Sequence, residues 1–66
     1  MAKQLELSGR CYWILSEPDQ AGWRAWVVEA RSDGTSDEVG IAATGETRGI
    51  ADDRAERKLR RMLQTP

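Results

Sequence analysis

The chain is 66 residues long, carries a formal net charge of −1, and contains one cysteine and no histidine. This length allows one domain, residues 1–66, with a core of marginal stability, so we expect a second copy or a partner to add stability. One cysteine excludes an internal disulfide. Without histidine the chain also lacks a tetrahedral zinc site and the usual base of a nucleophilic enzyme. We therefore expect no catalysis, no metal and no cofactor.

The sequence offers no membrane segment. No stretch approaches the ~20 apolar residues that a membrane span requires. Residues 1–10 lack the apolar core of a signal peptide, and the single thiol, Cys11, is typical of a reducing compartment. We expect a cytoplasmic protein.

Charge is distributed unevenly along the chain. Residues 1–46 contain four Lys or Arg against eight acidic residues, whereas residues 47–66 contain six Lys or Arg against three acidic residues. A dipolar chain of this kind suits oriented docking onto a partner. It fits a general polyanion binder less well, because such proteins are usually basic overall.

Period-two alternation predicts the first strand in residues 5–15, where Gly9 is interpreted as a bulge or bend. The apolar residues of this segment share odd positions: Leu5, Leu7, Cys11, Trp13 and Leu15. Residues 16–22 are predicted to form a loop and residues 23–31 a second strand. An acidic turn over residues 32–38 then leads to a short third strand, residues 39–44.

A helix is predicted to follow Gly45, with Thr47 as its N-cap. Apolar residues recur there at helical spacing: Ala51, Ala55, Leu59, Met62 and Leu63. The predicted fold is therefore α+β, a three-stranded antiparallel sheet with one C-terminal helix packed on one face (β-β-β-α).

One helix covers one face of a sheet, so the other face is expected to bind a partner. On strand parity the predicted uncovered residues are Tyr12, Ile14, Trp23 and Val27. The same parity places Trp13 and Trp26 in the core and makes Trp23 the exposed anchor, a residue type enriched in interface hot spots. A second predicted partner-binding surface is the helical stripe of Arg54, Arg57 and Arg61.

The chain resembles the HicB-type antitoxins in the order of an aromatic first strand, the stretch "EPDQAGW", a second strand, and "GET" before a helix with alanines four residues apart. Gly45, Glu46 and Thr47 occupy the G-x-T motif of that family, and the likeness covers roughly residues 11–63. The family's "P-D-L-P-G-C" type stretch is replaced here by "RSDGTSDEVG". The resemblance implies a reduced ribonuclease-H-like core without an active site, and a partner that masks another protein.

We therefore expect a non-catalytic protein-binding module, present as a homodimer or within a complex, that inhibits a toxin or a nucleic-acid-processing complex. The alternative is a small RNA- or DNA-binding domain that uses the basic C-terminal helix. A double-stranded RNA-binding domain is disfavoured, because its basic cluster lies at the start of the final helix, where this chain has Asp52 and Asp53.

Overall fold

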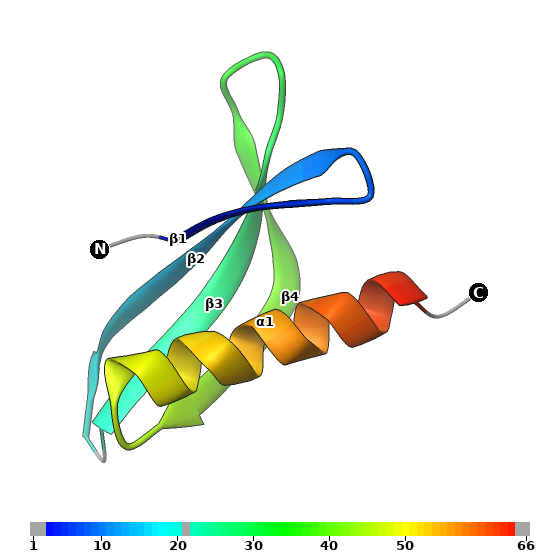
Figure 1. Ribbon diagram of the computed structural model, residues 1–66. Coiled ribbons are helices and arrows are strands. Elements are labelled where there is room, and N and C mark those ends of the chain that lie inside the picture. The colour runs from blue at the N-terminus through cyan, green and yellow to red at the C-terminus, as the bar shows by residue number, and fades with distance from the viewer. Residues whose placement is uncertain (1–2, 21, 65–66) are drawn as a thin grey trace.

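The computed structural model describes residues 3–20 and 22–64, which form four strands followed by one helix. The elements are β1 (Lys3–Leu7), β2 (Arg10–Asp19), β3 (Gly22–Ala30), β4 (Ser36–Gly45) and α1 (Arg48–Gln64). The strands pair antiparallel in the order β1-β2-β3-β4, and α1 crosses one face of this twisted sheet (Figure 1). The α+β class and the C-terminal helix are confirmed, whereas the prediction of three strands is wrong.

The additional strand arises from a tight turn inside the segment that was predicted to be one strand. Leu7 pairs directly with Arg10, and the two residues between them, Ser8 and Gly9, have φ angles of 55° and 75°. Two consecutive positive φ angles are typical of the type I′ turn that closes a two-residue hairpin. The chain therefore reverses at Gly9 instead of bulging there.

The core lies between α1 and the sheet. Its buried members are Tyr12, Ile14, Ala25, Val27, Ala43, Ala51, Ala55 and Leu59. The helical stripe is thus confirmed for its first three residues, and the two alanines allow α1 to lie close to the strands. Leu63 packs against this core as well, but Met62 is 43% exposed, which contradicts the prediction for that residue.

The predicted faces of the first two strands are wrong. Tyr12, Ile14 and Val27 were expected on the uncovered face, but they are at most 1% exposed and lie beneath α1. Trp23 is half-buried and packs against the same core. The reason is the hairpin turn, because a reversal after Leu7 places odd positions of β1 and even positions of β2 on one face.

The inward side of β4 carries Val39, Ile41 and Ala43. Between the pairs Val28–Glu38 and Trp26–Ala42, β4 has two more residues than β3. This extra length allows Val39 and Ile41, which are two residues apart, both to pack against the core. This irregularity is a β-bulge, which bends β4 and preserves the inward direction of both side chains.

The corner between β4 and α1 follows the G-x-T motif. The backbone N–H of Ile50 donates to Thr47 Oγ1 at 3.2 Å, which confirms Thr47 as the N-cap. A Cβ at position 45 would lie 2.7 Å from Ile50 Cγ2 and 2.8 Å from the backbone nitrogen of Ala51. The sharp approach of the helix to the strand therefore requires glycine at position 45.

Candidate functional site

The sheet face opposite α1 carries apolar side chains on its two central strands. Trp13 lies opposite Val28, and Leu15 lies opposite Trp26. We define the apolar band as the half-buried residues that share this face: Cys11, Trp13, Leu15, Trp26, Val28 and Ala30. Among the described residues α1 is the one helix, and it packs on the other face of the sheet, so no helix covers the band.

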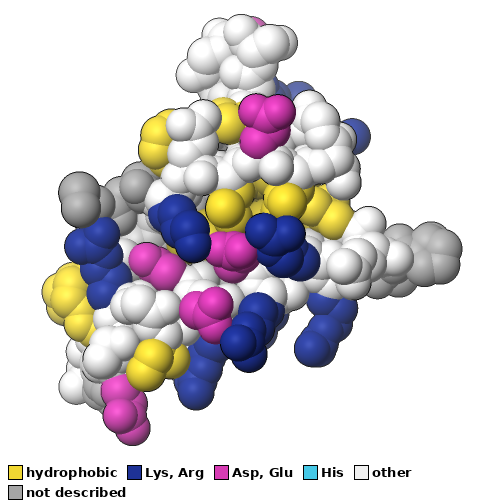
Figure 2. All heavy atoms as spheres, in the orientation of Figure 1, with side chains coloured by type: hydrophobic (Ala, Val, Ile, Leu, Met, Phe, Trp, Pro, Cys, Tyr) yellow, Lys and Arg dark blue, Asp and Glu magenta, His cyan; other side chains and the backbone are white. Residues whose placement is uncertain are grey.

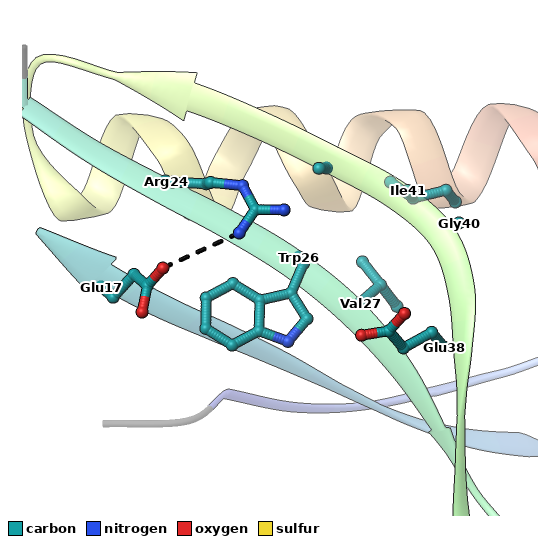
Figure 3. Close-up of a pocket in the computed structure, with 8 residues that line it drawn as sticks. Glu17, Arg24, Trp26, Val27, Glu38, Gly40 and Ile41 are labelled. Atoms are coloured by element: carbon teal, nitrogen blue, oxygen red, sulfur yellow. Dashed lines mark ion pairs between the residues drawn. The ribbon is translucent and has the colours of Figure 1, made fainter. Parts of the chain in front are cut away.

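The borders of the apolar band are acidic. Glu6 lies opposite Cys11, Glu38 lies opposite Val28, and Glu17 lies opposite Arg24. We call Glu6, Glu17 and Glu38 the acidic rim. The guanidinium of Arg24 is 3.7 Å from Glu17 Oε1 and 5.6 Å from the centroid of the Trp26 ring (Figure 3). Since this cation is paired with Glu17, Glu6 and Glu38 leave the rim with excess negative charge.

A shallow hollow of about 390 Å³ opens beside the band where β4 bulges away from β3. Trp26 forms one wall of it, Glu38 stands at its edge, and Gly40 leaves the opposite side without a side chain (Figure 3). The hollow has room for one side chain of a partner. Its lining favours a residue with an apolar stem and a cationic end, because Trp26 and Ile41 supply apolar walls and the carboxylate of Glu38 attracts a cation.

The positions of the tryptophans are the reverse of those predicted. Trp13 and Trp26 lie on the uncovered face, and Trp23 packs against the core. Cys11, predicted to face the core, also lies on the uncovered face, where its Sγ is 3.0 Å from Gln4 Nε2. The sequence analysis missed these residues because it interpreted Gly9 as a bulge or bend. Interpreting Ser8 and Gly9 as a two-residue hairpin turn would have placed these residues on the uncovered face.

The helical arginines are brought together as predicted. Arg54, Arg57 and Arg61 line one cleft of about 310 Å³ between α1 and β4, together with Lys58. Arg57 Nε is 3.1 Å from Asp53 Oδ2. Figure 2 shows the helix face, on which Lys and Arg side chains lie among carboxylates.

Two cations of this cleft contact the edge of the sheet. Arg54 Nη1 donates to the carbonyl oxygen of Thr44 at 3.0 Å, and Lys58 Nζ donates to the carbonyl oxygen of Ala42 at 2.8 Å. Both carbonyls belong to β4, the last strand of the sheet. Arg54 and Lys58 therefore have a structural role in covering this edge, a role that strand and helix patterns did not indicate.

The described residues contain no group of three or more His, Cys, Asp or Glu side chains that could hold a metal ion. Two carboxyl groups have shifted pKa values. Hydrogen bonds from Thr35 lower the pKa of the exposed Asp33, and a hydrogen bond from Lys3 lowers the pKa of Glu56. Both shifts stabilise the charged carboxylate, which is the direction expected of structural ion pairs and turns. Within the same described segments, no helix has the length and apolarity needed to span a membrane.

The G-x-T motif that carries the likeness to HicB-type antitoxins has a structural explanation, because Gly45 and Thr47 form the strand–helix corner. The alanine spacing likewise places Ala51 and Ala55 in the core. Comparison of the chain with protein-family models, with curated proteins and with solved structures finds no match.

Proposed function

We propose that the protein is a non-catalytic, antitoxin-like binding module that docks through its uncovered sheet face onto a basic protein and masks it. The observation that carries this proposal is the apolar band with its acidic rim, on a face that α1 does not cover. The partner class follows from the chemistry of this face. An apolar patch bordered by Lys and Arg, as on proteins that handle nucleic acid, would complement both the band and the rim.

The dimensions of the molecule suit a protein interface. Its principal extents are 34 × 28 × 16 Å. A stable protein–protein interface buries roughly 800 Å² on each partner, which a face of this size can supply. Trp13 and Trp26 stand on neighbouring strands within the band, and tryptophans at the centre of an interface often contribute most of the affinity.

Capture of the partner from a lysate with three tagged chains tests this function. The wild-type chain and Arg57→Glu are expected to recover the same protein, and Trp26→Ser is expected to lose it. With the purified partner, Trp26→Ser should weaken binding by about 2 kcal/mol, roughly 30-fold in Kd. Because Trp26 lies outside the core, circular dichroism should show that all three chains are folded.

The outcome that would contradict this function is the reverse pattern: capture that survives Trp26→Ser and is lost with Arg57→Glu. Hydrogen exchange on the reconstituted complex provides an independent check. Protection is expected at amides of β2 and β3 and at the hollow beside Gly40, and not along the exposed side of α1.

Nucleic-acid binding through the helix is the second candidate, because four cations line the cleft between α1 and β4. Its support is weaker, since Arg54 and Lys58 already donate to β4 carbonyls. Salt separates the two candidates. Binding to phosphates falls steeply between about 50 and 200 mM salt, whereas docking through the apolar band changes little. Recovery of nucleic acid alone, lost after nuclease treatment, would favour this second candidate.

A further inference from the structure

The two edges of the sheet differ in how their main-chain groups are covered. β4 is one edge, and its outward carbonyls at Ala42 and Thr44 accept hydrogen bonds from Lys58 and Arg54. Side chains that cover an edge in this way prevent the addition of another strand. The part of β4 around Ala42 and Thr44 is therefore covered, and β1 is the other edge of the sheet.

The hairpin turn determines which groups of β1 point outward. In a two-residue hairpin the closing pair, here Leu7 and Arg10, is hydrogen bonded, and hydrogen-bonded pairs then alternate along the strand. Leu5 and Lys3 consequently direct their main-chain groups toward β2. Gln4 and Glu6 direct theirs away from the sheet, and both residues are exposed.

We propose that β1 pairs antiparallel with β1 of a second copy of this chain, with Gln4 opposite Glu6 of the second copy and Leu5 opposite its own equivalent. This register joins the two outward-facing residues of each strand, so it forms four main-chain hydrogen bonds about a two-fold axis. It also places each Gln4 amide beside a Glu6 carboxylate on the uncovered face. A register centred on Glu6 would instead oppose two carboxylates, which is unfavourable for a cross-strand pair.

Leu5 gives this edge an apolar contact on the other face of the sheet. It is half-buried in one copy, where it packs against the core. In the proposed register the two Leu5 side chains would meet at a non-hydrogen-bonded position, where facing Cα atoms are about 4.5 Å apart. The second copy would thereby cover the part of Leu5 that one copy leaves exposed.

The pairing has a consequence for the whole molecule. A two-fold axis through paired edge strands stands perpendicular to the sheet, so the dimer is one eight-stranded sheet with both helices on one face. Both apolar bands then lie side by side on the other face. This inference does not depend on the proposed function, because it uses the edge of the sheet and leaves the apolar band free.

Sedimentation and light scattering on variants of Gln4 test the pairing. The wild-type chain should have twice its 7.4 kDa mass. Gln4→Lys creates two Lys–Glu pairs in the dimer and should tighten it, and Gln4→Glu creates two carboxylate pairs and should weaken it. Each pair of charges across strands has a modest energy, so the dimer Kd should shift roughly 2- to 30-fold in each direction.

A disulfide tests the register directly. In a Cys11→Ala background, Leu5→Cys should cross-link the two copies on mild oxidation, because the facing positions meet the Cα separation of a disulfide. The control Glu6→Cys in the same background places its thiol opposite Gln4 and should not cross-link. A monomer mass for the wild-type chain would overturn the proposal. So would a dimer that is insensitive to both Gln4 variants and is lost in Trp26→Ser.

Discussion

Val27 and Val28 are adjacent residues on opposite faces of β3, and they provide a sharp test of which face forms the core. Val27 is 1% exposed and lies opposite Ile14 beneath α1. Val28 lies opposite Trp13 on the uncovered face and is half-buried. Substitution of either valine by threonine preserves the shape of the side chain and replaces a methyl group with a hydroxyl. The two variants therefore differ only in where that hydroxyl is placed.

Val27→Thr should destabilise the protein far more than Val28→Thr. A hydroxyl buried without a partner costs about 1–3 kcal/mol, and Val27 lies among apolar side chains of the core, opposite Ile14. A chain of this size has a free energy of unfolding of about 3–10 kcal/mol. The loss is therefore a large fraction of the total. Val28→Thr should change stability by less than about 0.5 kcal/mol, because water reaches the hydroxyl there.

Urea unfolding measures both variants, with the three tryptophans as natural fluorescent reporters and circular dichroism as a second probe. With an m-value near 1 kcal/mol/M for a small domain, the midpoint should fall by about 1–3 M in Val27→Thr. The midpoint of Val28→Thr should stay close to that of the wild-type chain. An equal or larger loss in Val28→Thr would refute the assignment of the core to the Tyr12 face.

Substitution by alanine at two glycines near the helix start should change stability in opposite directions. Gly45→Ala would place its Cβ 2.7 Å from Ile50 Cγ2 and should destabilise the protein by about 1–3 kcal/mol. The Cβ of Gly49→Ala meets nothing within 4 Å, so this variant should stabilise α1 by about 0.5–1 kcal/mol. Equal midpoints of the two variants in thermal unfolding would contradict both expectations. Acid should weaken the protein partly through Glu56, whose pKa lies below its ordinary value because Lys3 donates a hydrogen bond to it. This stabilisation is complete above the unfolded-state pKa of 4.5 and is lost as pH falls through the lower folded-state pKa. Glu56→Gln should therefore reduce the fall in unfolding free energy below pH 4.5. An unchanged dependence of stability on pH would show that the Lys3–Glu56 pair contributes nothing.

The helix and the fold class could be predicted because their signals are local. Alanines and leucine at four-residue steps specify a buried stripe without reference to the rest of the chain, and Ala51, Ala55 and Leu59 are fully buried. Thr47 after Gly45 is likewise a local start signal. A helix encodes its own hydrogen bonds and its own apolar face, so these predictions needed no knowledge of the sheet.

The faces of the sheet could not be predicted by the same means. Strand parity carries meaning only within one uninterrupted strand, and a two-residue turn reverses it. Leu5 and Leu7 appeared to continue the odd positions of residues 11–15, but the turn at Ser8 and Gly9 pairs them with the even ones. A single local error therefore inverted the roles of every aromatic residue in β2 and β3. The polarity of the side chains also could not show which face forms the core, because both faces of the central strands are apolar.

The uneven charge of the chain gains a spatial meaning in the folded protein. The basic C-terminal segment supplies the cleft beside β4, while the acidic rim borders the uncovered face on the other side of the sheet. Two uncovered faces packed against each other would bring acidic rims together, and charges of like sign at an interface are unfavourable. We infer that the rim disfavours self-association through this face. Pairing through β1 would then give the small chain its additional stability and still leave the apolar bands available to a basic partner.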